Sequence, residues 1–203
     1  MDEQVLVATR RALHGVAESV IAGPQYRAHG TIRLTVSDGG FAGVASPLRV
    51  QGTELVGPAG RWPLRGTLGE LGAAAGVDTG PPEGLYSDTS GVALDEPLAV
   101  DPAAAELILG WFGRGDAGLR AFLPEATPVL WPEHFDLGID LDEVNYGISP
   151  GDAGHAFPYA YVGPWTPREG EFWNAPFGAV RPASDLPDAA AVAAFFAEGR
   201  SQA

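Results

Sequence analysis

The sequence predicts a single α+β domain, because short strand patterns form two groups that are separated and flanked by helical patterns. The strand groups cover about residues 30–65 and 130–180, and helices are expected near both ends and in the middle of the chain. A chain of 203 residues is long enough to bury a core of its own. We therefore expect one domain over residues 1–203 with an antiparallel β-rich core, and a doubly wound α/β fold is the alternative.

The N-terminal, middle and C-terminal helices are indicated by apolar residues at helical spacing and by typical terminal residues. Asp2 is a suitable N-terminal cap, and Gly23-Pro24 is expected to end the first helix. Thr67 and Glu70 form a capping-box pattern. The expected helices cover residues 2–22, 67–75, 102–112 and about 188–198, with a separate helical turn at 116–123.

The first strand group is predicted to be an antiparallel meander. In residues 31–36 every second residue is apolar, and Asp38-Gly39-Gly40 is typical of a turn. The residues 76–93 that follow this group are rich in Gly and Pro and are expected to form a long mobile loop. The further strands of the meander fit residues 48–51, 54–56 and 61–64.

The composition indicates an acidic globular protein whose partners do not include nucleic acid or a membrane surface. The formal net charge is −14, and all 12 basic residues are arginine, whereas binding to phosphates needs clustered cations. Because the chain has no cysteine and no lysine, disulfides, thiol catalysis and Schiff-base chemistry are excluded. The acidic N-terminus and the lack of an apolar stretch of about 18 residues predict a cytoplasmic protein.

The most unusual stretch is residues 121–167, which contain seven acidic residues and no arginine. Ten of the 19 aromatic residues lie between Trp131 and Phe177. Within this stretch, residues 134–142 alternate strictly between apolar and polar, which predicts a half-buried strand with one polar face. That face would carry His134, Asp136, Gly138, Asp140 and Asp142.

We expect this strand face to line an acidic, aromatic pocket formed by residues 131–177, which would bind a polar or cationic small molecule. A loop over residues 143–155, a strand ending in a proline-rich turn at 158–167 and an edge strand at 172–179 are expected to complete the pocket. The alternative is that the acidic face lies open to solvent. The predicted ligand-binding residues are His134, Asp136, Asp140, Asn145, Tyr146, Tyr161, Trp165, Trp173 and Asn174.

A divalent metal is the cofactor that these residue types would suit. Clustered Asp, Glu and Asn oxygens suit calcium or magnesium. The alternative ligand set, His134, Asp136 and His155, supplies two imidazoles and one carboxylate, as in non-haem iron oxygenases.

Two other hypotheses of catalytic function have weaker support. Asp136, Asp140 and Glu143 are candidates for the carboxylate pair of a glycosidase, but their spacing specifies no such enzyme. Residues 147–151 match the Gly-x-Ser-x-Gly pattern of serine hydrolases, yet the following Pro150 and Gly151 favour a tight turn over the required helix.

Several runs of the sequence resemble an uncharacterised family of proteins from high-GC bacteria of the actinobacterial type. The resemblance covers the whole chain and is most specific between about residues 130 and 180. Because no activity is assigned to that family, the resemblance implies a bacterial, cytoplasmic protein and no residue roles. The runs that carry it are 130–136, 143–147, 149–152, 161–165 and 172–178.

Three classes of function therefore remain open from the sequence. The first is a small-molecule or cation binding protein with the pocket described above. The second is a metal-dependent enzyme that uses His134, Asp136 and His155 or the nearby carboxylates. The third is a homo-oligomeric interaction module whose aromatic C-terminal segment forms the interface.

Overall fold

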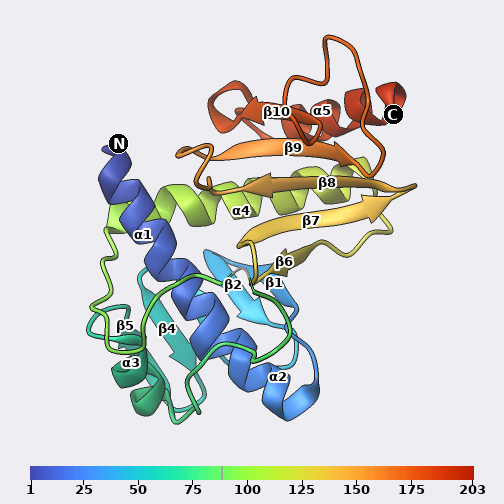
Figure 1. The fold of residues 1–203 in the computed structure, drawn as a ribbon. Helices are drawn as coiled ribbons and strands as arrows, with labels where there is room; N and C mark the ends of the chain where they lie inside the picture. Colours follow the sequence, from blue (N-terminus) through green and yellow to red (C-terminus); the bar gives the residue numbers. More distant parts are fainter. Residues whose placement is uncertain (88) are drawn as a thin grey trace. The chain divides into compact units, whose positions relative to one another are not determined.

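The structure of the protein, a computed structural model, describes residues 1–87 and 89–203. It divides into two compact units. The N-terminal unit comprises residues 1–110 and 130–135, and the C-terminal unit comprises residues 111–129 and 136–203. Helices occur near the N-terminus, in the middle and at the C-terminus, and the strand pairings are antiparallel, which confirms the predicted α+β class (Figure 1). One domain over residues 1–203 stays a prediction.

The N-terminal unit begins with a helical segment that is longer than predicted. It consists of α1 (Glu3–Gly15), the π-helix η1 (Val16–Ala22) and α2 (Gly23–His29). The prediction that Gly23-Pro24 ends the helix is wrong, because Ala22 and Gly23 keep helical dihedral angles and the helical backbone continues through Pro24 into α2. The helix instead ends at Gly30, which adopts the left-handed conformation with φ 71°.

The predicted meander is present in the sheet of the N-terminal unit. The strands lie in the order β6-β1-β2-β3-β4-β5, and α3 (Leu68–Ala75) follows with the predicted capping box between Thr67 and Glu70. The strands are β1 (Leu34–Ser37), β2 (Gly40–Gly43), β3 (Arg49–Gln51), β4 (Glu54–Gly57), β5 (Gly60–Pro63) and β6 (Val129–Trp131).

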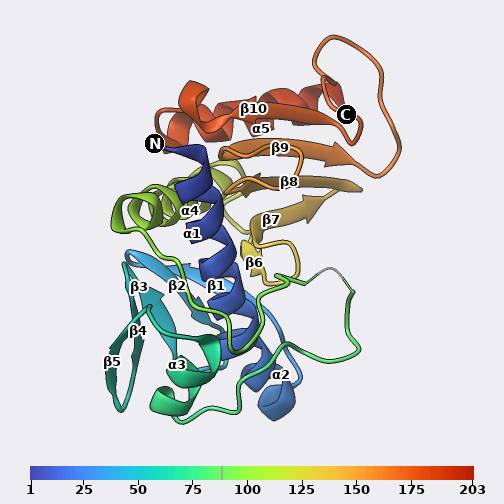
Figure 2. The same cartoon turned by 60° about the vertical axis from the view of Figure 1, so that its left-hand side comes forward.

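The segment between α3 and the next helix has neither helix nor strand among its described residues (Figure 2). Several of its hydrogen bonds join it to the helical segment. One partner there is Glu18 of η1, which is only 1% exposed. One Glu18 oxygen accepts from the Tyr86 hydroxyl at 3.2 Å, and the other accepts from the Ser90 N–H at 3.0 Å and hydroxyl at 2.6 Å. Burial raises the pKa of Tyr86, and the Glu18 charge raises it further, so Tyr86 remains a donor.

The predicted mobile loop over residues 76–93 corresponds to this segment. Residue 88 lies outside the described residues, and mobility itself stays a prediction. The described part is tied to the helical segment at further points, because Gly80 N–H donates to the Ser19 carbonyl at 2.9 Å and Arg11 donates to the Gly91 carbonyl at 2.6 Å.

The C-terminal unit contains four sheet strands, which are hydrogen-bonded in the order β7-β8-β9-β10 (Figure 1). Its strands are β7 (Asp136–Leu141), β8 (Val144–Ser149), β9 (Tyr159–Pro164) and β10 (Ala179–Pro182). A short 3-10 helix, η2 (Ala183–Asp185), leads to α5 (Ala189–Gln202), which Asp188 caps and which extends beyond the predicted end at about residue 198.

The middle helix α4 (Pro102–Phe122) is continuous, so the prediction of a separate turn at 116–123 is wrong. Its glycines serve close packing in the C-terminal unit. A Cβ atom on Gly115 would collide with Ile148 of β8, and one on Gly118 would lie 2.5 Å from Val192 of α5. Packing against neighbouring elements therefore outweighs the low helix propensity of glycine here.

Three local predictions for the second strand group are corrected by the structure. The strand predicted over residues 134–142 begins only at Asp136, because His134 lies in a turn and Phe135 has φ 52°, which is incompatible with an extended strand. The loop predicted over 143–155 begins instead as strand β8, and the edge strand predicted over 172–179 begins only at Ala179.

Strands β7 and β8 form a hairpin with a two-residue turn. Asp142 and Glu143 have φ values of 52° and 63°, as a turn with both central residues in the left-handed region requires. This turn matches the twist of the flanking strands, and it allows Val144, Tyr146 and Ile148 to continue an apolar face in β8.

The described part of the chain contains no helix that is both long and apolar enough to cross a membrane.

Candidate functional site

The acidic residues of β7 and several other predicted ligand-binding residues lie on one face of the C-terminal sheet. Gly138, Gly147 and Tyr161 are direct neighbours across β7, β8 and β9. Because residues two apart in a strand share a face, Asp136 lies on the same side as Gly138. The structure thus confirms that Asp136 and Asp140 share one strand face. Asp140, Asn145 and Gly163 are direct neighbours across β7, β8 and β9 on the same face.

Tyr161 covers the centre of this polar face and engages Asp136. Its hydroxyl donates a hydrogen bond to the Asp136 carboxylate. Its ring lies over Gly147, where a Cβ atom would be 2.5 Å from the ring carbon Cζ. Burial, followed by the Asp136 charge, raises the pKa of Tyr161 well above its ordinary value, so this hydroxyl is a donor and not a base.

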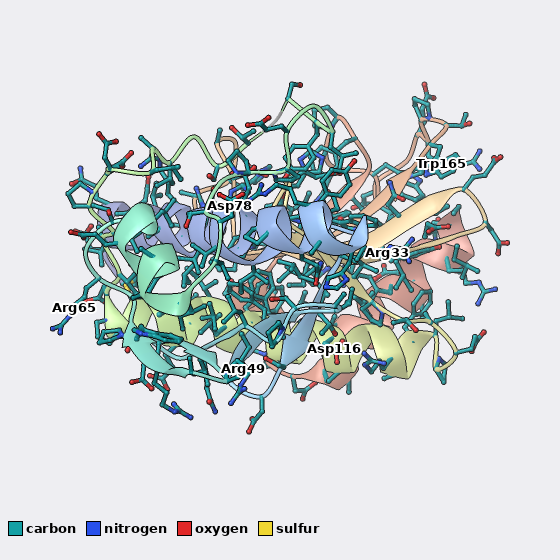
Figure 3. The ribbon with its side chains drawn as sticks, turned by 90° about the horizontal axis from the view of Figure 1, so that it is seen from below. Arg33, Arg49, Arg65, Asp78, Asp116 and Trp165 are labelled. Atoms are coloured by element: carbon teal, nitrogen blue, oxygen red, sulfur yellow. The ribbon has the colours of Figure 1, made fainter. Side chains whose placement is uncertain are left out.

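Asn145 and Trp165 meet at the outer end of the same face. The Trp165 indole N–H donates to the Asn145 Oδ1 at 3.3 Å, and the Trp165 backbone N–H donates to the Glu143 carbonyl at 2.9 Å. Trp165 is nonetheless 64% exposed (Figure 3). The structure therefore brings Asp140, Asn145 and Trp165 together on an open surface.

Tyr146 lies on the opposite face of β8 and belongs to the core. It is 1% exposed, and its ring centre lies 4.9 Å from that of Phe122 and 6.0 Å from that of Phe196. This placement makes Tyr146 a packing residue between the sheet and the helices α4 and α5.

The three residues predicted as a metal-binding set are not assembled. His134 lies in the turn before β7, Asp136 begins β7, and His155 lies in the loop between β8 and β9. His155 lies near Asp152, with 3.9 Å between Nδ1 and Oδ1, and its ring centre is 5.0 Å from that of Tyr159. Among the described residues, no group of three His, Asp or Glu side chains is placed to hold a metal ion.

Asp152 organises the loop between β8 and β9. One oxygen accepts from the backbone N–H groups of Gly154 and His155 at 2.6 and 2.7 Å, and the other accepts from the Tyr159 hydroxyl. Burial alone would raise the pKa of Asp152, but these hydrogen bonds outweigh burial and leave that pKa below its ordinary value.

A lowered pKa in the folded state stabilises the protein above the unfolded pKa of about 4, and this contribution is lost as the pH falls toward the folded value. We therefore expect Asp152→Asn to lower the melting temperature at pH 7, and the difference from wild type to shrink as the pH falls below about 4. Thermal unfolding at several pH values would measure this. Tyr159→Phe removes one of the hydrogen bonds and should weaken the same pH dependence. A difference that stays constant with pH would contradict the role of the Asp152 charge.

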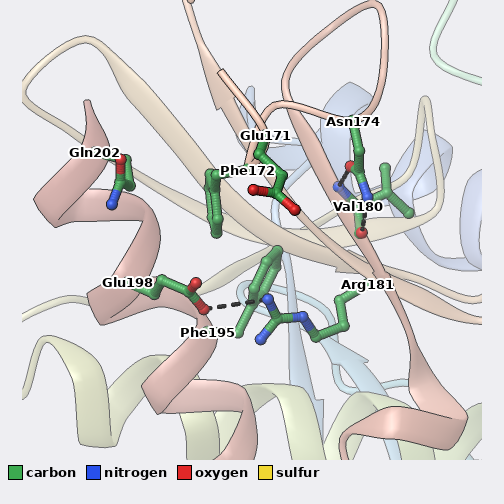
Figure 4. A pocket seen from close by; sticks show the side chains of 8 residues that line it. All are labelled: Glu171, Phe172, Asn174, Val180, Arg181, Phe195, Glu198 and Gln202. Atoms are coloured by element: carbon green, nitrogen blue, oxygen red, sulfur yellow. Dashed lines mark hydrogen bonds and ion pairs between the residues drawn. The ribbon is translucent and has the colours of Figure 1, made fainter. Parts of the chain in front are cut away.

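A hollow in the C-terminal unit lies among β10, α5 and the segment before β10 (Figure 4). Its volume of about 490 Å³ falls within the roughly 300–1,000 Å³ of typical small-molecule pockets. The hollow, called the α5 pocket below, is lined by Glu171, Phe172, Asn174, Val180, Arg181, Phe195, Glu198 and Gln202.

The Arg181 side chain forms one wall of the α5 pocket. The Arg181 guanidinium donates to Glu198 at 3.1 Å, and its carbon atom lies 4.6 Å from the centre of the Phe195 ring (Figure 4). Phe172 packs at an angle against Phe195, with 5.7 Å between ring centres. A charge-assisted hydrogen bond and a cation–π contact together hold Arg181 in place.

Asn174 forms another wall and is fixed by the edge strand. Its amide donates to the Val180 carbonyl at 3.1 Å and accepts from the Val180 N–H at 2.8 Å (Figure 4). These bonds satisfy backbone groups on the free side of β10 and so protect the edge of the sheet from pairing with another strand.

Asn174 is the one predicted ligand-binding residue among those lining the α5 pocket. Trp173 lies beside it, and its ring meets Phe172 edge-on at 4.9 Å. The other lining residues were missed, although Phe195, Glu198 and Gln202 recur at intervals of three and four and therefore share one face of a helix. Nothing in the sequence indicates that this helix face and Glu171 line the same pocket.

No family profile, curated protein sequence or solved structure matches this chain. The α5 pocket and the polar sheet face are therefore interpreted from their own geometry.

Proposed function

We propose that the protein binds a small organic cation in the α5 pocket. The supporting observation is a pocket of small-molecule size in which two carboxylates and two phenyl rings converge around a single arginine. Glu171 and Glu198 against Arg181 leave one negative charge in the lining. Carboxylates and aromatic faces are the groups that recognise organic cations.

The charge of the whole protein favours the same class of ligand. A formal net charge of −14 creates a negative potential that attracts cations and repels anions. Arg181 does not offset this preference, since its guanidinium is already bound by Glu198 and Phe195. The proposal also includes that the protein is bacterial and cytoplasmic and has no nucleic-acid partner.

Calorimetric titration with agmatine, N-acetyl-arginine amide, choline and the anion succinate tests the proposal. At least one of the three cations should bind, and it should bind more tightly than succinate. Localised chemical-shift changes at the Val180 amide and the Gln202 side-chain amide would place the ligand in the α5 pocket. Binding of none of the three cations, or binding of succinate more tightly than every cation, would overturn the proposal.

Glu171→Gln should weaken binding of the cation about tenfold, because it removes a charge that faces the ligand, at a cost of about 1.4 kcal/mol. Calorimetric titration of the variant would measure this change. Glu169→Gln is the matched control, since it removes the same charge from an exposed residue of the same segment that lies outside the pocket lining. An equal effect of the two substitutions would mean that only the general negative potential attracts the ligand.

A further inference from the structure

The α5 pocket contains hydrogen-bond acceptors that the protein itself leaves unused. Among the described residues, neither the Glu171 carboxylate nor the Gln202 side-chain amide has a hydrogen bond or ion pair with another protein group. Glu198 engages Arg181 through one oxygen, Oε2. The carboxylate of Glu171 and the ring of Phe172 point into the hollow (Figure 4).

The aromatic surface in the pocket is less available than these acceptors. Arg181 lies over the Phe195 ring, and Phe172 is in contact with both Phe195 and Trp173. A quaternary ammonium group has no N–H donors and depends on free ring faces for its binding. A cation with several N–H groups can instead donate hydrogen bonds to Glu171, to the second oxygen of Glu198 and to the Gln202 amide oxygen.

The pocket already binds one guanidinium, that of Arg181. Glu198 and Phe195 of α5 supply a carboxylate and a ring for this group. Glu171 and Phe172, adjacent residues of the segment before β10, supply a second carboxylate and a second ring. The planar guanidinium, with its fork of N–H donors, is the cation that pairs with a carboxylate through two parallel bonds.

From this arrangement we infer that the ligand of the α5 pocket carries a guanidinium group, which Glu171 binds beside Phe172 and which Gln202 selects through its amide oxygen. This inference rests on the proposed function and narrows its ligand class. A free guanidino compound and an arginine side chain of a peptide present the same chemistry to the pocket.

The test compares agmatine, N-acetyl-arginine amide and choline by calorimetric titration of the whole protein. At least one guanidinium probe should bind ten times or more tightly than choline, and the tighter of the two identifies a free or a peptide-borne source. Binding of choline within tenfold of the tighter guanidinium probe, or tighter than it, would overturn the guanidinium assignment and leave the proposed cation site standing. Failure of all three probes to bind would overturn both.

A second variant tests the selection by hydrogen bonding. Gln202→Leu should weaken the guanidinium probe about fivefold, because one hydrogen bond is lost, while choline, which has no N–H group, keeps its affinity. Gln202 is exposed near the end of α5, so the variant should fold normally. Equal weakening of both probes would contradict a role for the Gln202 amide.

Discussion

Replacing Glu18, which is 1% exposed, with alanine should lower the free energy of unfolding by about 3 kcal/mol, since hydrogen bonds to a charged group each contribute about 1.5–3 kcal/mol. The substitution removes the acceptor of the Ser90 N–H, the Ser90 hydroxyl and the Tyr86 hydroxyl. Chemical denaturation would measure the loss. Hydrogen exchange at the amides of Gly80 and Ser90 should accelerate as well, because both lie in the segment that is tied to η1.

Glu83→Ala is the matched control for this prediction. Glu83 lies in the same segment and is exposed, so its removal changes the same charge without leaving a buried donor unsatisfied. We expect a change within about 0.5 kcal/mol for this variant. Similar losses in the two variants would show that net charge, and not the buried hydrogen bonds of Glu18, stabilises the N-terminal unit.

Replacing Gly147 with alanine should destabilise the C-terminal unit by about 1–3 kcal/mol, the usual cost of overpacking. The new Cβ atom would lie 2.5 Å from Cζ of the Tyr161 ring and 2.8 Å from the Leu137 carbonyl oxygen. Because that oxygen is in the neighbouring strand, the clash cannot be relieved by a side-chain rotation alone. Tyr161 must move, which also disturbs its hydrogen bond to Asp136.

Gly163→Ala provides the control on the same sheet face. Its Cβ atom would meet the Phe177 carbonyl oxygen at 3.5 Å, which is an ordinary contact. Thermal unfolding should therefore show a large loss for Gly147→Ala and a small change for Gly163→Ala. Near-normal stability of Gly147→Ala would mean that Tyr161 has no fixed position over the sheet.

Features that depend on residues close together in the sequence were predictable from the sequence. The alternation within residues 136–141 placed Asp136 and Asp140 on one strand face, because successive side chains in an extended chain point to opposite sides. The capping box of Thr67 and Glu70 was equally local, since it involves side chains and backbone groups within three residues.

The limits of the β7 strand show where local patterns fail. His134 fits the alternation of the strand, yet Phe135 adopts a left-handed conformation and packs its ring against His14 at 5.3 Å and Phe41 at 5.6 Å. These contacts come from distant parts of the chain, so no pattern around residue 135 indicates them. The metal hypothesis based on His134 depended on an extended conformation that Phe135 does not adopt.

By itself, the sequence determined the α+β class, the acidic character and the polar face of β7. Only the tertiary structure decided which residues meet across that face and in the α5 pocket. Asn145 reaches Trp165 through the register of β8 and β9, and Arg181 reaches Glu198 through the packing of α5 beside β10. The physical reason is that alternation and capping act over a few residues, whereas strand register and helix packing result from burying apolar surface across the whole unit.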